Sequence, residues 1–553
     1  MKSYRLRERA HAELIPDLLH GRGIAEGEES ARFLEPDYLR DSHDPFLLPD
    51  MGPAVERIMS AAKNNEQIAV WSDYDCDGIP GGVMLAEFLR SLNLSVRHYI
   101  PHRHDEGYGL NSEGIDELAG QKISLIITVD LGSSDLEPIT HAKKKGIDVI
   151  VTDHHLLPAI LPPAFAIINP KRAGSRYPFQ GLCGAGVAWK LVQALLLKQR
   201  PEGFTEGREK WLLDLVGMAT LSDRVPLVGE NRMLARFGLL VMRKNRRPGF
   251  AALLRMLRIE APRLTEDDIG FMIAPRINAA SRMDAPGIAA RLLATQDREE
   301  AGALALELQS LNNERKGVVA ATVKEAKRRI AESEALAKGI IVMGSPNWRP
   351  GILGLVANSL SEAEGKPVCL WGREGGNTIR GSCRSDGSVN VVEMMRRAGD
   401  LFLDFGGHMF SGGFSLQEEK IFELTPRLVA AYETLRAQDF GTQEIMLDRE
   451  LPLEEISFAS RDLMKLAPFG EGNAKPLFLL PGVSIAGVRS FGKSGDHLEI
   501  TLARADKKVS AISFFNTPDS FEKKPVVGMR ADIVGHVENG WNGRPRVRVV
   551  DVL

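Results

Sequence analysis

The sequence predicts a multidomain α/β protein, in which a doubly wound parallel sheet comes first and a small β-barrel comes last. Three observations support this prediction. Short apolar runs alternate with helical patterns from about residue 66 to 170. Apolar residues recur at helical intervals from residue 295 to about 338, and short alternating runs fill the chain from 483 to 552. Each of these patterns of apolar residues is typical of one kind of secondary structure. The order of the patterns along the chain predicts the architecture.

The first domain is predicted from four apolar runs at 68–71, 95–100, 125–129 and 149–152. Several of them are nearly continuous in apolar residues, which is typical of strands buried on both faces of a parallel sheet. We expect this domain to cover residues 51–294, after an N-terminal segment at 1–50.

A long connecting helix is predicted at 295–338, because the segment lacks proline and repeats apolar residues at helical spacing. Acidic residues lie near its start, where they favour a helix N-terminus. Gly317 is a candidate interruption. Strand-like runs then return at 339–343 and 367–371, and a glycine-rich stretch follows at 406–413. We expect a second α/β domain at 339–435.

The C-terminal region, residues 440–553, is predicted to form an OB-like β-barrel, because five short alternating runs are separated by turn residues such as Asn539-Gly540. OB-folds bind single strands by combining aromatic stacking with phosphate attraction. Several of the barrel aromatics must instead be core, and the sequence does not choose among them. The candidates are Phe491, Lys493, His497, Phe514, Phe515 and Trp541.

Composition excludes several classes of protein. The 553 residues are 44% hydrophobic and 26% charged, with a formal net charge of -3, so the chain does not coat nucleic acid by bulk charge. A net charge of this size still permits a local basic groove on the surface. The four cysteines form no CxxC pair, which suggests neither a zinc site nor a disulfide framework. The sequence has no uninterrupted apolar stretch of about 18 residues, which a membrane-spanning helix would need. We therefore expect a cytoplasmic protein that does not span the membrane.

The strongest chemical signal is the acidic cluster Asp73, Asp75 and Asp77, directly after the first predicted strand. If the chain stays extended there, the three carboxylates project to the same side and require cations. An EF-hand loop is the alternative interpretation. It is disfavoured because its twelfth position is Met84, where a bidentate glutamate is needed, and because a strand precedes the loop.

Further acids follow the next strands: Asp130 ends the run at 125–129, and Asp153, His154 and His155 end the run at 149–152. Ligands of parallel α/β sheets gather at the carboxyl ends of strands, so these residues should converge. Asp223 follows a helical segment. Any one of these residues could be a solvated loop acid or a cap, but together they indicate two Mn²⁺ or Mg²⁺ ions.

The segments 73–78, 128–130 and 153–155, with Asp223, resemble the four motifs of the DHH phosphoesterase superfamily. Within it, further segments resemble the RecJ family of nucleases, in the family's order, and the resemblance covers the chain from about residue 45 to the end. These segments are 101–110, 182–187, 275–282, 311–316, 347–357, 380–385, 405–408 and 468–473.

The resemblance implies roles for the catalytic residues. Asp75 and Asp77 each bind one metal ion, and Asp130 bridges both. His154 and Asp223 complete one coordination shell, and His155 faces the scissile phosphate. The chain has Trp71 four residues before Asp75, where the wider superfamily often has histidine, so Asp73 is an additional candidate ligand.

The resemblance also implies a substrate and a reaction. The second α/β domain is of the DHHA1 type, and the expected reaction is 5′ to 3′ exonuclease hydrolysis of single-stranded DNA to 5′-mononucleotides, in DNA repair and recombination. A single-stranded-DNA-binding protein and a helicase are candidate partners of a monomeric enzyme. The alternatives are a DHH oligonucleotide or cyclic-dinucleotide phosphodiesterase, or an inactive DHH scaffold. The candidate phosphate-binding residues are Arg103, Arg276, Arg282, Arg380, Ser382, Arg384 and His408.

Overall fold

The computed structural model describes residues 3–103, 106–283, 285–333, 339–373, 378–436, 444–492, 495, 497–540 and 543–553. The chain forms two compact units. One contains Met1–His43, Arg224–Phe237 and Gly441–Leu553, and the other contains Asp44–Asp223 and Gly238–Phe440. Each is described by itself.

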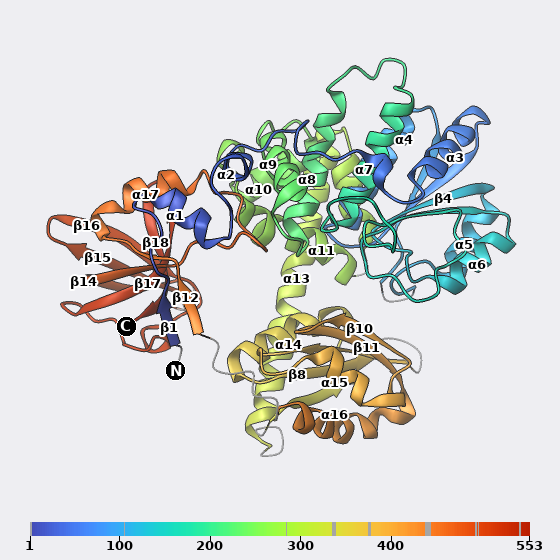
Figure 1. The fold of residues 1–553 in the computed structure, drawn as a ribbon. Coiled ribbons are helices and arrows are strands. Elements are labelled where there is room, and N and C mark those ends of the chain that lie inside the picture. Colours follow the sequence, from blue (N-terminus) through green and yellow to red (C-terminus); the bar gives the residue numbers. More distant parts are fainter. Residues whose placement is uncertain are drawn as a thin grey trace. The chain divides into compact units, whose positions relative to one another are not determined.

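The larger unit begins with a five-stranded parallel sheet in the order β3-β2-β4-β5-β6. Its strand β4 is labelled in Figure 1, beside α5 and α6. The predicted doubly wound sheet is confirmed. Its order reverses between β2 and β4, which makes the carboxyl ends of these two strands a switch point where ligands bind. The short fifth strand was not predicted. The bounds are β2 (Gln67–Ser72), β3 (Ser95–Tyr99), β4 (Ile123–Val129), β5 (Asp148–Thr152) and β6 (Ala166–Ile168).

Helices cover both faces of this sheet. On one face, α5 (Ser112–Gly120) and α6 (Leu136–Lys144) pack on a core that includes Trp71 and Ile126. The other helices that contact the strands are α3 (Met51–Lys63), α4 (Gly78–Ser91) and α7 (Gly184–Lys198). Trp71 therefore faces a hydrophobic core.

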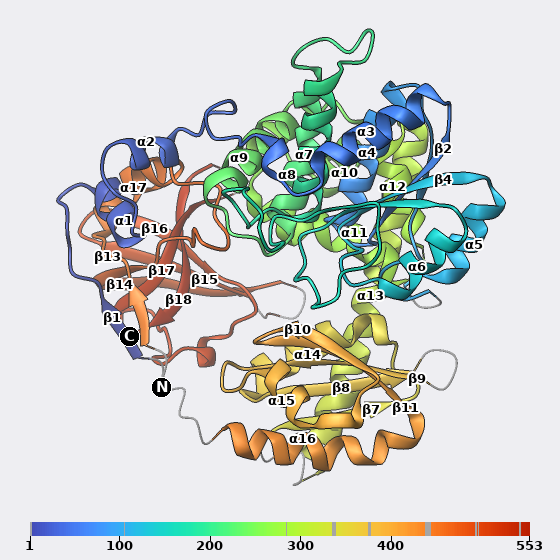
Figure 2. The same cartoon turned by 45° about the vertical axis from the view of Figure 1, so that its right-hand side comes forward.

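A helical segment follows and leads into the long helix α13 (Arg298–Ala331), which passes toward a second sheet (Figures 1 and 2). Asp297 caps α13 by accepting bonds from the amides of Glu299 and Glu300. The predicted break near Gly317 is wrong. A glycine inside a helix costs only about 1 kcal/mol, and this one faces open space. The preceding helices are α8 (Leu213–Ser222), α9 (Gly229–Arg243), α10 (Pro248–Leu257), α11 (Ala274–Arg282) and α12 (Pro286–Ala294).

The second sheet has the order β10-β11-β9-β8-β7, with β7 and β8 parallel and the other pairs antiparallel. The glycine-rich stretch forms the β10–β11 hairpin, which sequence periodicity did not predict. The bounds are β7 (Ile341–Ser345), β8 (Val368–Arg373), β9 (Thr378–Arg384), β10 (Asp404–His408) and β11 (Ser411–Gln417), with helices α14 (Pro350–Glu364), α15 (Val391–Arg397) and α16 (Ile421–Leu435).

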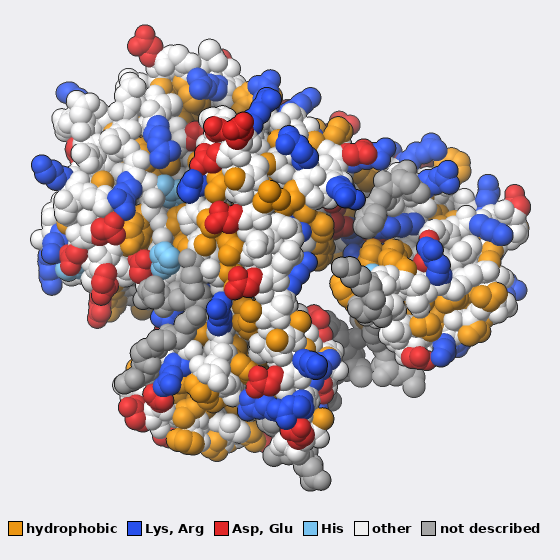
Figure 3. Space-filling model, turned by 180° about the vertical axis from the view of Figure 1, so that it is seen from behind, with side chains coloured by type: hydrophobic (Ala, Val, Ile, Leu, Met, Phe, Trp, Pro, Cys, Tyr) orange, Lys and Arg blue, Asp and Glu red, His pale blue; other side chains and the backbone are white. Residues whose placement is uncertain are grey.

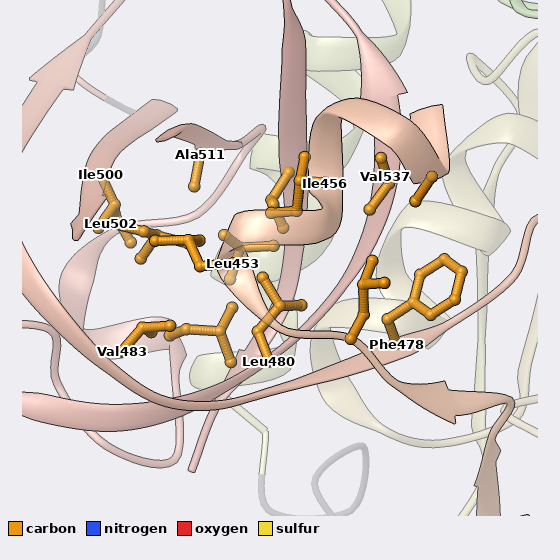
Figure 4. Close-up of a cluster of buried hydrophobic side chains, with 14 of the residues drawn as sticks. Leu453, Ile456, Phe478, Leu480, Val483, Ile500, Leu502, Ala511 and Val537 are labelled. Atoms are coloured by element: carbon orange, nitrogen blue, oxygen red, sulfur yellow. The ribbon is translucent and has the colours of Figure 1, made fainter. Parts of the chain in front are cut away.

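The smaller unit is built on a closed five-stranded barrel. Its strands pair in the order β14-β15-β16-β18-β17, with β16 and β18 parallel, and the barrel closes because β17 also pairs with β14. This confirms the predicted OB-like fold. Figure 4 shows the apolar side chains that fill it, among them Leu480 and Ile500. The bounds are β14 (Phe478–Phe491), β15 (His497–Arg504), β16 (Lys507–Ser513), β17 (Arg530–Asn539) and β18 (Pro545–Val552), with β13 (Arg449–Glu450) and α17 (Ile456–Leu463) beside them.

The N-terminal segment belongs to this barrel unit. Leu18 and Leu19 of α1 (Leu14–Gly21) and Phe33 of α2 (Glu28–Leu34) are part of the barrel core cluster. In addition, β1 (Ser3–Leu6) pairs in parallel with β12 (Glu444–Leu447). The buried guanidinium of Arg232 donates to the carbonyl oxygens of Phe33 and Leu466, at 2.7 and 2.9 Å. The unit is thus assembled from three distant stretches of sequence.

The surface in Figure 3 carries basic and acidic side chains interspersed with apolar ones, as the small net charge leads one to expect. Within the described part of the chain, no helix combines the length and apolarity needed to cross a membrane.

Candidate metal centre

The acidic residues meet at the carboxyl edge of the parallel sheet. Past each strand end the ladder continues for one more residue. The amide of Asp73 donates to Val129, that of Asp130 to Thr152, and that of Asp153 to Ile168, at 3.0 to 3.2 Å. This pairing holds three acidic positions side by side at the switch point between β2 and β4.

The chain does not stay extended after β2 as predicted, although the charges of Asp73, Asp75 and Asp77 all act on Asp130. The strand ends at Ser72 and the chain turns at once into α4, which begins at Gly78. A carboxylate oxygen of Asp75 accepts bonds from the amides of Asp77 and Gly78, at 2.7 and 3.1 Å, and stabilises this turn. Asp73 and Asp75 consequently lie in one group, and Asp77 lies in another.

Asp77 is held by the N-terminus of α7, where the amides of Gly184 and Ala185 donate to its two carboxylate oxygens at 2.6 and 2.8 Å. Gly184 permits this approach, since a Cβ atom there would lie 2.4 Å from the Cβ of Asp130. Asp130 itself has a φ of 66°, a left-handed conformation that is rare outside glycine and tends to occur at functional sites.

The two histidines after β5 point to different environments. His154 is buried, and its Nε2 lies 3.2 Å from Asp130, 3.7 Å from Asp223 and 3.9 Å from Asp77. The ring of His155 is half-exposed.

Asp153 organises this pair. Its carboxylate accepts the amides of both histidines and the Nδ1 of His155, the last at 2.8 Å. Burial alone would lower the pKa of His155, but the hydrogen bond and charge of Asp153 outweigh it and raise the pKa to about 9.

Three groups of side chains could each hold a cation, with ligand atoms within 4.8 Å of one another. Asp130 and His154 each belong to two of them, so the groups join into one centre. The groups are Asp73, Asp75 and Asp130; Asp77, His154 and Asp223; and Asp130, His154 and His155.

The chemistry of these donors fits divalent cations. Among the described residues, buried carboxylate oxygens of Asp73 and Asp130 have no hydrogen-bond partner. Burial, followed by the charges of Asp223 and Asp75, raises the pKa of Asp77 to about 8, and burial with neighbouring acids holds that of Asp130 well above its usual range. Burial lowers the pKa of His154 to about 3, which leaves the neutral imidazole that binds metals. A cation would remove the cost of these unpaired charges.

A cavity of about 280 Å³ opens over the acids. Arg103 and Arg282 line it, with the Arg103 guanidinium 4.7 Å from the centre of the Tyr74 ring. Tyr108 also lines the cavity and donates from its hydroxyl to the carbonyl oxygen of Asp130 at 3.0 Å. Sequence reasoning expected Asp153 at this site without giving it a role, and it did not single out Tyr74 or Tyr108, although each lies inside a quoted motif.

One second-sheet candidate, Arg380, contacts a residue that lines this cavity. Arg380 donates to the carbonyl oxygen of Arg103 at 3.3 Å, and Arg282 donates to that of Gly351 at the start of α14. Arg380, Ser382 and Arg384 alternate along β9 and therefore share a face. A Cβ atom on Gly354 of α14 would lie 2.7 Å from Arg384 and 3.7 Å from Ser382, so both side chains pack against that helix.

Among the phosphate-binding candidates, Arg103 and Arg282 line the cavity, whereas Arg276 and His408 neither line it nor belong to β9. Arg276 is buried, and its guanidinium donates to Gln309 at 2.8 Å and to the carbonyl oxygen of Met272. His408 ends the edge strand β10 and is exposed.

Family models match three parts of the chain: "DHH family, N-terminal domain" at residues 67–220, "DHHA1 domain" at 336–433 and "RecJ OB domain" at 447–550. The fold and the site thus define the class, which is the DHH phosphoesterases.

Individual relatives show to which family of DHH phosphoesterases the chain belongs. Single-stranded-DNA-specific exonuclease RecJ of Bacillus subtilis is 34% identical over 551 residues, which are 99% of this chain and 68% of the relative. RecJ of Escherichia coli is 33% identical, with 84% and 83% covered. The chain belongs to the RecJ family.

Solved structures agree with this assignment. The crystal structure of RecJ from Thermus thermophilus in complex with Mn²⁺ matches with a TM-score of 0.79 and 28% identity, and the match covers 100% of this chain and 79% of that one. A crystal structure of exonuclease RecJ bound to manganese matches with a TM-score of 0.60 and 31% identity, covering 71% of this chain and 98% of that one.

Proposed function

We propose that this chain is a metal-dependent exonuclease that hydrolyses single-stranded DNA from its 5′ end and releases 5′-mononucleotides. The observation that carries the proposal is the joined set of buried carboxylates and imidazole at the switch point, centred on Asp130 and His154. The relatives are named for this activity, and one matched structure holds Mn²⁺ while another holds Mg²⁺.

Asp75, Asp77, Asp130, His154 and Asp223 are the proposed metal ligands, with Asp73 as a sixth, since it lies beside Asp75 and Asp130. Two divalent ions held by these residues would lower the pKa of a water molecule and would stabilise charge on the phosphoryl and leaving oxygens. The chain supplies the rest of the chemistry. Asp153 orients His155 through the 2.8 Å contact with its Nδ1 and favours the protonated ring, and His155 would face the scissile phosphate.

The proposed phosphate contacts come from both sheets. Arg103 and Arg282 line the cavity over the acids, and guanidinium groups bind phosphate through charge-assisted hydrogen bonds. Ser382 and Arg384 of β9, with Arg380, would hold the terminal 5′-phosphate. This anchor sets the polarity, since the same metal chemistry could act at either end of a strand.

The barrel supplies a candidate surface for the rest of the strand. The rings of Phe491, Phe514 and Phe515 surround His497, with centroids 4.8 to 5.6 Å from it. The guanidinium of Arg548 lies 6.0 Å from the centre of the Phe514 ring. Such clusters suit base stacking. The candidates Lys493 and Trp541 lie outside the described residues.

In the cell, we propose a cytoplasmic monomer in DNA repair and recombination, working with a single-stranded-DNA-binding protein and a helicase. The proposed division of the chain is an N-terminal segment (1–50), the DHH domain (51–294), the connecting helix (295–338), the DHHA1 domain (339–435) and the OB-fold (440–553).

Polarity is tested with DNA strands labelled at the 3′ end and carrying either a 5′-phosphate or a 5′-hydroxyl. With Mn²⁺, we expect shortening from the 5′ end on single strands and little on duplex. A charge-assisted contact is worth roughly 1.5–3 kcal/mol, so Arg384→Ala should slow cleavage of the 5′-phosphorylated strand by about ten- to a hundredfold. It should slow cleavage of the 5′-hydroxyl strand less.

The matched control is Arg396→Ala, which removes an exposed arginine paired with Glu393 on α15. It should behave as wild type. Shortening from the 3′ side, or an equal loss on both substrates with Arg384→Ala, would rule out the anchor. If the enzyme hydrolysed only cyclic dinucleotides or very short oligonucleotides, these would replace single-stranded DNA as the proposed substrate.

A further inference from the structure

A second cavity, of about 260 Å³, lies elsewhere in the larger unit. It is bordered by the C-terminal part of α4, the short helix η2 (Arg208–Leu212), the start of α8, the end of α9 and the turn into α10. The residues that define it are Phe88, Phe204, Arg208, Trp211, Arg246 and Phe250.

Two helices, α4 and α8, each run between the metal centre and this cavity. Asp77 immediately precedes α4 and Asp223 immediately follows α8, whereas Glu87 of α4 and Asp214 of α8 line the cavity. A helix rises about 1.5 Å per residue, so about nine or ten residues place the cavity roughly 14 to 15 Å from the catalytic acids. It therefore lies toward the amino ends of the strands, away from the edge where the ligands of this fold bind.

The walls combine apolar rings with exposed positive charge. Phe88 and Phe250 are buried, and Trp211 is exposed to 36%. The guanidinium of Arg246 lies 3.6 Å from the centre of the Trp211 ring, and that of Arg208 lies 5.2 Å from the centre of the Phe204 ring. Stacking of this kind fixes a guanidinium in place while leaving its N–H groups available for acceptors.

The acidic side chains of the cavity are already neutralised. Arg247 pairs with Asp214 at 2.8 Å and with Glu87 at 3.1 Å. Arg208 and Arg246 are exposed at the rim. The three arginines outnumber the two carboxylates, so the cavity presents a net positive charge to an approaching molecule.

We propose that this cavity is a docking site for an acidic segment of a partner protein, which inserts one apolar or aromatic side chain between the rings while its carboxylates pair with Arg208 and Arg246. The volume suits a single anchoring side chain, since it lies below the roughly 300–1,000 Å³ of sites that enclose small-molecule ligands. A buried aromatic anchor with charged contacts at its rim is the usual arrangement of an interface hot spot.

The substrate strand is the less favoured occupant. Its reacting end lies at the opposite edge of the sheet, and of the basic run 243–247 two arginines are engaged within the unit. Arg243 donates to the carbonyl oxygen of Leu264, and Arg247 forms the ion pairs described above. Few phosphate contacts would remain for a strand.

The test is a selection of peptides from a random display library on the full chain, with counter-selection on the Arg208→Glu/Arg246→Glu variant. We expect the enriched peptides to be acidic and to share one apolar or aromatic residue. A fluorescently labelled synthetic copy of the leading peptide should lose about tenfold or more in affinity for the double variant and for Trp211→Ala, as expected for loss of a charge-assisted contact or an aromatic anchor.

Arg255→Glu reverses an exposed charge on α10 outside the cavity, and it should bind the peptide as wild type does. All variants should keep wild-type nuclease activity, which also shows that they fold. Trp211→Phe should restore most of the peptide affinity lost in Trp211→Ala. The proposal is overturned if the selection yields no acidic peptides, if the enriched peptides bind the double variant equally well, or if the double variant loses affinity for single-stranded DNA instead.

Discussion

Asp130 shows how a single residue can link the fold to the proposed chemistry. Its left-handed φ of 66° costs of order 1–3 kcal/mol in a residue other than glycine. The surrounding structure must maintain that conformation. Gly184 is part of the reason that it can, because the missing side chain lets the start of α7 approach Asp130 and bond to Asp77.

Gly184→Ala should therefore impair hydrolysis without unfolding the protein. Its Cβ atom would lie 2.4 Å from that of Asp130, so the acid must move, and a displacement of about 1 Å can cost on the order of a hundredfold in rate. Gly186→Ala is the matched control on the same helix, since its Cβ atom would meet nothing closer than 3.5 Å. Equal rates for the two variants in a Mn²⁺-dependent assay would contradict this reading of Gly184.

At this scale, sequence reasoning located residues that the structure brings together, namely Asp75, Asp77, Asp130, His154 and Asp223. The resemblance put Asp75 and Asp77 at separate ions, with His154 and Asp223 completing one shell, and the ligand groups of the structure separate the same residues. The turn after Ser72 was not foreseen, because an alternating pattern assumes an extended chain. The bond from His155 to Asp153 and the cavity residue Tyr108 were not foreseen, since such hydrogen bonds leave no periodic signal in the sequence.

Among the elements, helix α1 depends on one buried acid. Asp17 accepts hydrogen bonds from the amides of Ala10 and His11 and lies 3.2 Å from Arg7 and 3.6 Å from Arg449. Burial would raise the pKa of Asp17, but these bonds and charges together lower it. The acid thus ties the N-terminal segment to the start of the barrel.

Asp17→Asn should lower the free energy of unfolding of the barrel unit by about 3 kcal/mol at neutral pH, because it leaves two cations without their partner. Since the folded pKa is depressed, this stabilisation is present above the ordinary aspartate pKa of about 3.9 and is lost as the pH falls through the folded value. Urea unfolding followed from pH 7 to pH 3 should show the two proteins converging in acid. Asp519→Asn, at an exposed pair with Lys524, should change stability little. A constant difference at all pH values would contradict this account.

The elements themselves were largely predictable where the apolar pattern was strong. The four predicted strands of the first sheet and the five barrel strands formed where the pattern placed them, within a few residues. The short strand β6 and the glycine-rich hairpin β10–β11 were not foreseen, since three residues carry no period and glycines carry no apolar signal.

At the scale of the whole molecule, the barrel is not an appendage that can be removed cleanly. Leu18, Leu19 and Phe33 fill part of its core, and Arg232 bonds to its backbone. Deleting residues from about 440 onward would expose these groups. Packing between distant segments of this kind is invisible to local sequence patterns. Point variants are the better test of the barrel.

Phe515→Ala should weaken the binding of a labelled single strand by about 1–3 kcal/mol, the usual value of one base stacked on an aromatic ring. Phe515 is exposed to 80% and packs against His497, so its loss should not disturb the core. Phe458→Ala removes another exposed phenylalanine, on α17, and should leave binding unchanged. Equal affinities of the two variants, measured by fluorescence anisotropy at constant salt, would assign the cluster another role.

The most direct test of the account is a titration of the full chain with Mn²⁺, followed by calorimetry and by hydrolysis of single-stranded DNA in the same samples. Because Asp130 belongs to two of the three ligand groups, wild type should bind two ions and cleave, whereas Asp130→Asn should lose at least one ion and nearly all hydrolysis while keeping its fold. Near wild-type cleavage by Asp130→Asn at saturating Mn²⁺ would contradict the two-metal centre.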